Sequence, residues 1–160
     1  MKKILIYTAL VIATAILIPT NYASANLDDS TAIHIDGNVQ FPPNRWRTVR
    51  HSFRVHIPKN GKAVNQLIIK VPSSVTVSNN IKNIDVEDEN EQKISTNASV
   101  EGKTVRLVFP EPVAPNSILH IDLNNVQRRN FGNGHVYRFS ATVVGSKAEI
   151  PVGVAWFRMY

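Results

Sequence analysis

Strict alternation of apolar and polar residues is the clearest pattern in this chain, and it covers positions 47–57. One set of side chains would share a face of the strand: Val49, His51, Phe53, Val55 and Ile57. The intervening set would share the opposite face: Thr48, Arg50, Ser52, Arg54 and His56. Because successive side chains of a strand point to opposite faces, this period of two predicts a β-strand with one buried and one solvated face.

Shorter apolar segments recur along the rest of the chain and are separated by residues that favour turns. They predict strands at 31–35, 66–71, 75–77, 98–100, 104–109, 118–123, 135–144 and 149–158. Pro110, Pro112 and Pro115 are expected to break the chain into a loop after the segment at 104–109. No segment shows the 3.6-residue apolar period of an amphipathic helix.

These short strands predict an all-β fold, an antiparallel Greek-key (immunoglobulin-like) β-sandwich of about eight or nine strands. The connections are too short for the helical crossovers that parallel strands need. The residues expected in or beside the core are Phe53, Val55, Leu107, Phe109, Leu119, Ile121, Tyr137 and Phe139.

The N-terminus has the three-part order of a secretory signal peptide. Lys2 and Lys3 precede an apolar run at 4–18, and small residues follow in the segment Ala23-Ser24-Ala25. The alternative, a membrane anchor, is disfavoured because the apolar run is short for a membrane span. We therefore expect a cleaved signal peptide at 1–25 and one β-sandwich domain at 26–160, in the periplasm or outside the cell and not integral to the membrane.

Composition and charge limit the classes of partner. The chain has no cysteine, so the exported protein has neither disulfides nor a lipid attached to an N-terminal cysteine. Without Lys2 and Lys3 there are 16 basic and 12 acidic residues, a net charge of +4. This modest excess is weak evidence for an anionic partner, and export argues against nucleic acid.

Several turn and strand motifs resemble one protein family. They are Phe41-Pro42-Pro43, Pro112-Val113-Ala114-Pro115-Asn116-Ser117, Ile121-Asp122-Leu123-Asn124-Asn125-Val126, His135-Val136-Tyr137-Arg138-Phe139 and the ending Gly153-Val154-Ala155-Trp156-Phe157-Arg158-Met159-Tyr160. With the signal peptide, they resemble the exported proteins, found mainly in cyanobacteria, that are catalogued as domain of unknown function 2808. The resemblance implies a fold but no catalytic residue, since that family has no established activity. Members often have glycine where this chain has Asn116 and Ser117, two residues that also suit a turn.

The chain shows no motif of a metal site, a cofactor site or an enzyme. The five histidines are His34, His51, His56, His120 and His135, and no two have a spacing typical of metal ligands. His51 is expected to be partly buried and hydrogen-bonded. The acidic stretch at 85–91 offers oxygen ligands for calcium, but it lacks the spacing of a helix-loop-helix calcium site and is interpreted as a solvated loop.

Catalysis finds equally little support. There is no cysteine nucleophile, no Gly-x-Ser-x-Gly motif and no carboxylate pair that the pattern identifies. We therefore expect a non-catalytic binding or structural module of the cell envelope. The alternative is an enzyme or a metal-handling protein whose site is assembled only in the fold.

The most informative polar feature is a cluster of arginines. The residues of this candidate anion-binding surface are Arg45, Arg47, Arg50, Arg54 and His56. Arg50, Arg54 and His56 would project from one strand face. As a functional surface they would bind phosphate, sulfate or carboxylate groups of an anionic lipid, an acidic polysaccharide or an envelope protein. The competing and simpler interpretation is an ordinary charged outer face of a sheet.

Overall fold

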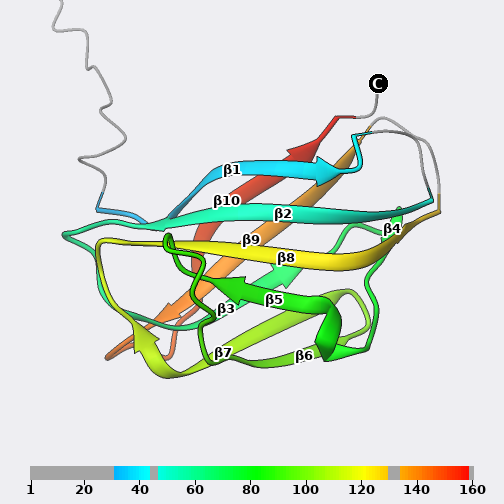
Figure 1. Ribbon diagram of the computed structural model, residues 1–160. Helices are drawn as coiled ribbons and strands as arrows, with labels where there is room; N and C mark the ends of the chain where they lie inside the picture. The colour runs from blue at the N-terminus through cyan, green and yellow to red at the C-terminus, as the bar shows by residue number, and fades with distance from the viewer. Residues whose placement is uncertain (1–30, 44–46, 130–133, 159–160) are drawn as a thin grey trace, which may run out of the picture.

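The computed structural model describes residues 31–43, 47–129 and 134–158, which form two facing antiparallel sheets (Figure 1). The strands are β1 (His34–Phe41), β2 (Thr48–Ile57), β3 (Val64–Lys70), β4 (Val75–Thr76), β5 (Ile84–Glu87), β6 (Asn97–Glu101), β7 (Thr104–Val113), β8 (Ser117–Arg128), β9 (His135–Val143) and β10 (Ile150–Phe157). A short 3-10 helix, η2 (Ile81–Asn83), leads into β5. The predicted all-β antiparallel sandwich is therefore confirmed, with ten strands in the described residues instead of eight or nine.

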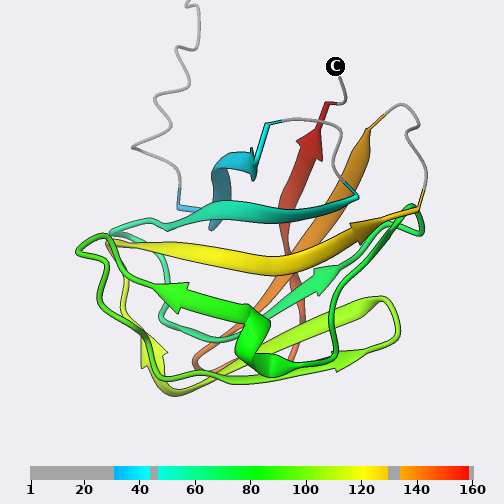
Figure 2. The ribbon, with the colours of Figure 1, turned by 45° about the vertical axis from the view of Figure 1, so that its right-hand side comes forward.

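Each sheet contains strands that are distant in the sequence. The first sheet has the order β1-β2-β8-β4, and β5 also pairs with β8. The second sheet has the order β10-β9-β3-β7-β6. Because β2 is followed by β3 and β7 by β8, the chain crosses repeatedly between the sheets, as in Greek-key sandwiches. Figure 2 shows β9 and β10 of the second sheet passing behind β2 and β8 of the first.

The alternating segments form the two central strands of the first sheet. In β2 the predicted apolar face is buried at every position, from Val49 to Ile57. In β8, Leu119, Ile121 and Leu123 are buried, whereas His120 is exposed. All eight core residues expected from the sequence are buried between the sheets, where they join one continuous hydrophobic cluster.

Several expectations about element boundaries are wrong. The strand β8 continues to Arg128 instead of ending at Leu123, and residues 85–87, expected in a solvated loop, belong to β5. Two further differences have a clear physical reason. The first strand runs from His34 to Phe41 instead of 31–35, because this segment pairs with β2 along its length. The strand β7 continues through Pro110 and Pro112 to Val113, where a loop was expected. The prolines are tolerated there because β6 pairs with β7 only as far as Val108, and the register with β3 shifts beyond that residue.

The outermost strands β1 and β10 lie against each other along one side of the sandwich (Figure 1). The Asn38 side-chain amide on β1 donates a 3.1 Å hydrogen bond to the Trp156 carbonyl oxygen on β10. Gly153 has a φ of 148°, and a Cβ there would lie 3.5 Å from Cγ1 of Ile35. The backbone conformation therefore favours glycine at this position, whereas a Cβ would meet Ile35 only at an ordinary contact distance.

The predicted signal peptide lies outside the described residues. Its cleavage and the resulting export therefore stay predictions. Among the residues that the structure describes, no helix has the length and apolar character needed to cross a membrane.

Candidate functional site

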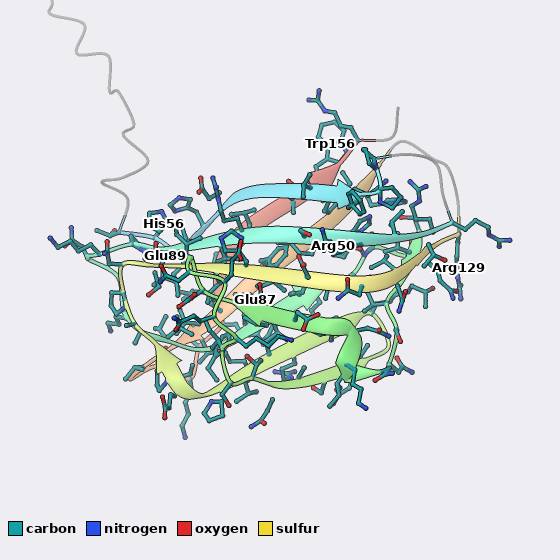
Figure 3. All side chains as sticks on the ribbon, viewed as in Figure 1. Arg50, His56, Glu87, Glu89, Arg129 and Trp156 are labelled. Carbon is teal, nitrogen blue, oxygen red and sulfur yellow. The ribbon has the colours of Figure 1, made fainter. Side chains whose placement is uncertain are left out.

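The arginines predicted from the pattern of β2 project from the outer face of the first sheet. Arg50 and Arg54 are exposed and His56 is half-buried on this face, and Figure 3 labels Arg50 and His56 there. Arg47 is exposed just before the strand begins. Arg45 lies outside the described residues. The structure thus brings Arg50, Arg54 and His56 to one face, as the two-residue period predicts.

Carboxylates on neighbouring strands pair with both strand arginines. Nη2 of Arg54 lies 2.7 Å from Oδ2 of Asp36 on β1, and Nη1 of Arg50 lies 3.5 Å from Oδ2 of Asp122 on β8. The four side chains are between 30% and 48% exposed. Ion pairs this accessible contribute only about 0–1 kcal/mol each to stability. They therefore orient the guanidinium groups but can be exchanged for other contacts at little cost.

An exposed aromatic ring adjoins these arginines. Phe41 on β1 lies opposite Arg50 in the strand register, and the Arg50 guanidinium carbon lies 5.4 Å from the centroid of the Phe41 ring. This is a cation–π distance. At the other end of the strand pair, the His34 and His56 rings meet edge to face with their centroids 5.0 Å apart.

A shallow depression lies on the same face, between β1, β2 and β8. Its volume is ≈ 330 Å³, and its lining residues are Gly37, Asn38, Val39, Ser52, Phe53, Arg54 and His120. Nothing lies within 4 Å of the position that a Cβ of Gly37 would occupy, so this glycine leaves the depression open. The lining offers the Arg54 guanidinium and the Ser52 hydroxyl as hydrogen-bond donors beside the apolar side chain of Val39. Such a surface suits an anionic group carried on a larger molecule.

Acidic side chains limit this surface on the far side of β8. Asp85 and Glu87 on β5 lie opposite Asp122 and His120 in the register, and Figure 3 shows Glu87 below the arginine-bearing strand. These carboxylates make the β5 side of the face unfavourable for an anion.

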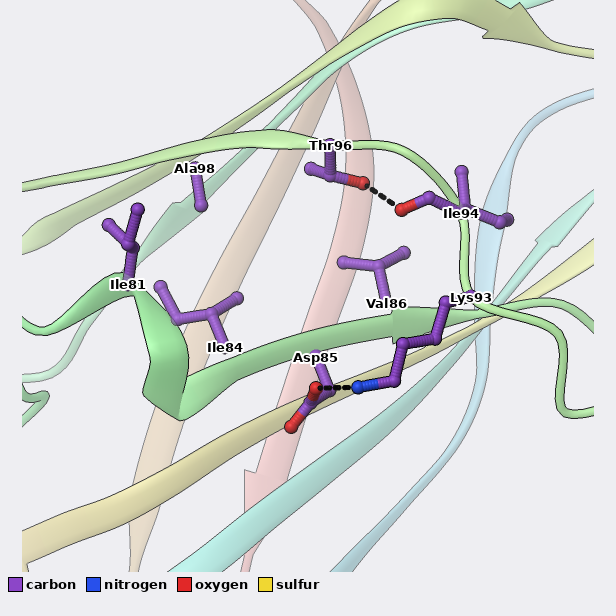
Figure 4. Close-up of a pocket in the computed structure, with 8 residues that line it drawn as sticks. All are labelled: Ile81, Ile84, Asp85, Val86, Lys93, Ile94, Thr96 and Ala98. Atoms are coloured by element: carbon purple, nitrogen blue, oxygen red, sulfur yellow. Dashed lines mark hydrogen bonds and ion pairs between the residues drawn. The ribbon is translucent and has the colours of Figure 1, made fainter.

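A second cavity, of ≈ 140 Å³, lies between β5 and β6 (Figure 4). Its lining is mainly aliphatic: Ile81, Ile84, Val86, Ile94 and Ala98, with Asp85, Lys93 and Thr96. Nζ of Lys93 lies 3.0 Å from Oδ1 of Asp85, and this carboxylate raises the pKa of Lys93. Ile84, Ile94 and Ala98 also pack against the hydrophobic core. The cavity is therefore a continuation of the core between β5 and β6, with few polar groups that could react with a ligand.

The acidic stretch at 85–91, expected to be a solvated loop, forms most of β5 and the turn that follows it. Oδ1 of Asp88 accepts hydrogen bonds from the backbone amides of Asn90 and Gln92, at 2.8 and 2.9 Å. These hydrogen bonds lower the pKa of Asp88. In the described ranges, no three His, Asp or Glu side chains are grouped as metal ligands. The carboxylate of Asp88 thus stabilises the turn by accepting hydrogen bonds from its backbone amides.

Sequence reasoning missed a polar cluster inside the core. His51 is fully buried, and its Nδ1 lies 2.7 Å from the Tyr137 hydroxyl of β9 in the other sheet. Its Nε2 lies 3.3 Å from Oε1 of Gln40, which also accepts from Nη1 of Arg128. Since that amide oxygen only accepts, Nε2 of His51 carries the proton and Nδ1 accepts from the tyrosine. The cluster therefore links the two sheets through a neutral imidazole.

Burial and a nearby cation keep this imidazole neutral. Desolvation, together with His135 and Arg128, lowers the pKa of His51 to about 3. Desolvation also lowers the pKa of His135, whose Nδ1 lies 2.7 Å from Oγ of Ser74. The His51 ring stacks on Phe157, with the ring centroids 4.1 Å apart. The prediction of a hydrogen-bonded His51 is therefore confirmed, although the residue is fully rather than partly buried.

Solved structures that are similar to this chain share little sequence identity with it. A bacterial hydrophobin, BslA, matches with a TM-score of 0.52 and 16% identity, over 81% of this chain and 92% of that one. The collagen-binding domain of a Staphylococcus aureus adhesin matches with a TM-score of 0.44 and 12% identity, over 80% of this chain and 96% of that one. A non-cellulosomal cohesin from Archaeoglobus fulgidus matches with a TM-score of 0.44 and 13% identity, over 79% of this chain and 90% of that one. At 16% identity, the similarity to BslA shows a similar fold alone.

The family of the chain is shown by its sequence. No curated protein matches it. The model of a family described as "Protein of unknown function (DUF2808)" matches residues 36–155, which include every strand from β2 to β9 and most of β1 and β10. The predicted resemblance is confirmed at the level of the family, and the chain belongs to the DUF2808 family of proteins of unknown function.

Proposed function

We propose that this protein is an exported, non-catalytic binding module that holds an anionic component of the cell envelope on the outer face of its first sheet. The observation that carries the proposal is the depression beside Arg54, which combines a guanidinium, a hydroxyl and an apolar wall. The proposed surface consists of Arg47, Arg50, Arg54 and His56, and it includes Arg45 from the sequence.

Displacement of the aspartates by a ligand is energetically feasible. The Arg54–Asp36 and Arg50–Asp122 pairs are solvent-accessible, so each contributes only about 0–1 kcal/mol. A guanidinium has five donors in a planar fork, so it can keep one contact with its aspartate and still donate to a phosphate, sulfate or carboxylate. The ion pairs therefore hold the arginines in position for a ligand.

The shape of the face favours binding over catalysis. Within the described residues of the depression, no hydrogen bond joins the Ser52 hydroxyl to the His120 imidazole, so this pair lacks the geometry of an activated nucleophile. The broad, open surface suits an extended partner such as an acidic polysaccharide or the headgroups of an anionic lipid layer.

The test compares the 26–160 protein with Arg50→Ala/Arg54→Ala in two assays, sedimentation with anionic vesicles and binding to an acidic polysaccharide. Each arginine lost should weaken binding by up to about fivefold, the equivalent of about 1 kcal/mol. Binding by the parent should also weaken with salt, since the screening length falls to about 3 Å at 1 M.

The matched control is Arg106→Ala/Lys147→Ala, which removes the same charge from β7 and from the turn between β9 and β10 in the second sheet. We expect this control to bind like the parent. Equal binding by the Arg50→Ala/Arg54→Ala variant, once circular dichroism shows that it is folded, would mean that the arginines form only a charged outer face.

A further inference from the structure

Exposed apolar side chains are concentrated on one side of the molecule. In the described part of the chain, seven large apolar side chains are substantially exposed, and five of them belong to β1, β9 and β10. Three of these five lie together on the outer face of the second sheet: Val136, Val154 and Trp156, with exposed fractions of 36%, 57% and 50%. A tryptophan half in water beside two exposed valines is an unusual use of apolar surface.

The strand register brings these residues into one patch. Trp156 lies directly opposite Val136, and Val154 lies directly opposite Arg138. Arg158 folds back over Trp156, with its guanidinium carbon 4.9 Å from the ring centroid. We call these five residues the tryptophan patch: Val136, Arg138, Val154, Trp156 and Arg158. Figure 3 shows Trp156 at the end of β10, on the side of the sandwich that β1 and β10 form.

The backbone holds the indole in place. Gly134 has a φ of 107°, and a Cβ there would overlap the indole nitrogen of Trp156 and the carbonyl oxygen of Phe157. The indole edge therefore lies directly on the Gly134 backbone, which restricts its rotation. A restricted aromatic side chain loses little conformational entropy when it binds a partner.

We propose that the tryptophan patch docks the protein onto the surface of an anionic lipid bilayer. Tryptophan prefers the interface between lipid headgroups and hydrocarbon, where its ring is buried and its N–H stays hydrated. Arg138 and Arg158 flank the indole at the level of the phosphates, with which guanidinium groups form paired hydrogen bonds. The strands β9 and β10 themselves contain no Asp or Glu. The carboxylate of Glu149 accepts a hydrogen bond from the Ser140 hydroxyl of β9, but this contact lies towards the other end of the strand pair from Trp156.

A second copy of the chain is a poorer occupant of this patch. In a two-fold dimer the patch would face itself, and Arg138 and Arg158 would lie against the same residues of the other copy. Like charges brought together in an interface weaken association. A bilayer instead satisfies both the apolar and the basic residues, the combination on which peripheral membrane binding depends. The proposal concerns a different sheet from the arginines of β2 and goes beyond the function proposed for them.

Vesicle sedimentation provides the test, with equimolar phosphatidylglycerol and phosphatidylcholine compared with phosphatidylcholine alone. Val154→Ser/Trp156→Ala should weaken binding to the anionic vesicles by about tenfold or more, because apolar burial at the interface is lost. Arg138→Ala should weaken it by about fivefold, as expected for one basic residue near an anionic surface. The control Ile81→Ser/Val144→Ser removes exposed apolar side chains elsewhere and should bind like the parent.

Fluorescence gives an independent readout. The chain has two tryptophans, so Trp46→Phe leaves Trp156 as the only one. Its emission should shift to shorter wavelength on anionic vesicles and should be quenched by brominated lipid. If Val154→Ser/Trp156→Ala is unstable, two measurements replace it. Vesicle sedimentation of the single variant Trp156→Gln tests the same contact, and so does the emission shift of Trp156 in Trp46→Phe.

Separate outcomes distinguish this inference from the function proposed for β2. Vesicle binding that is lost in Arg50→Ala/Arg54→Ala but kept in Val154→Ser/Trp156→Ala would overturn the inference and leave the proposed function standing. An unshifted Trp156 emission in vesicle-bound protein would also overturn it. Loss of polysaccharide binding, or of self-association, in the patch variants without any vesicle binding by the parent would assign the patch to another occupant and refute the inference.

Discussion

Replacing His51 tests whether the buried cluster makes stability depend on pH. In the folded protein, burial lowers the pKa of His51 to about 3, whereas an exposed histidine of the unfolded chain titrates near 6.5. Because the folded pKa is the lower of the two, the unfolded chain binds more protons between these values. The contribution of neutral His51 to stability is therefore complete above pH 6.5 and is lost as the pH falls from 6.5 towards 3.

The size of the effect follows from the two pKa values. Each pKa unit corresponds to about 1.4 kcal/mol, so the parent should lose about 2 kcal/mol of unfolding free energy between pH 8 and pH 5 through His51 alone. Burial also lowers the pKa of His135, which adds to the loss in the same direction. Carboxylates contribute little in this range, because they titrate mainly below pH 5.

Urea unfolding at constant ionic strength, at pH 8, 7, 6 and 5, measures this loss. His51→Gln should be less stable than the parent at pH 8, since the imidazole that links the sheets is gone. Its stability should nevertheless change with pH by about 2 kcal/mol less than that of the parent. His120→Gln is the control, because it removes an exposed imidazole of the same sheet. The double variant His51→Gln/His135→Gln removes both buried imidazoles whose pKa is lowered. If this variant still loses as much unfolding free energy as the parent between pH 8 and pH 5, the reasoning is refuted.

Three further predictions concern the core, the strand contact and export. Tyr137→Phe should lower the unfolding free energy by about 1–3 kcal/mol in urea titrations at pH 8, because Nδ1 of His51 loses its buried donor; an unchanged midpoint would contradict the hydrogen bond. Gly153→Ala should cost about 1 kcal/mol or more, since its φ of 148° disfavours a side chain, whereas Gly37→Ala has open space and should cost less than about 0.5 kcal/mol; equal costs would count against this account. Intact-mass analysis of exported protein should give a chain that begins at Asn26, and a retained Met1 would exclude cleavage.

The regular strands could be predicted from the sequence because their burial is periodic. In β2 and β8 one face is packed and the other solvated, so the sequence alternates. The strand β1 is an edge strand with few buried side chains, so its residues carry no such pattern. A loop was expected at the prolines of β7 because proline cannot donate a hydrogen bond to a neighbouring strand. The strand continues there because β6 does not pair with β7 beyond Val108, and this pairing depends on the topology of the sheet.

The arrangement of the functional side chains depended on contacts that no local pattern contains. The arginine face followed from alternation within β2. The pairing of Arg54 with Asp36 depends instead on the register between β1 and β2. His51 and Tyr137 are 86 positions apart and meet only because the two sheets pack face to face. A sequence that alternates can thus predict which side of a strand a residue occupies, but not which residue of another sheet it contacts.

The contact between β1 and β10 has a consequence for the behaviour of the protein at high concentration. A long edge strand with free backbone groups is a template on which other chains add strands and build fibrils. Here the register of β1 is interrupted between Ile35 and Gly37, and Pro151 leaves β10 without one amide donor. The Asn38 amide also occupies the Trp156 carbonyl oxygen. The apolar side chains on this side of the sandwich are therefore displayed on strands that resist amyloid-like stacking.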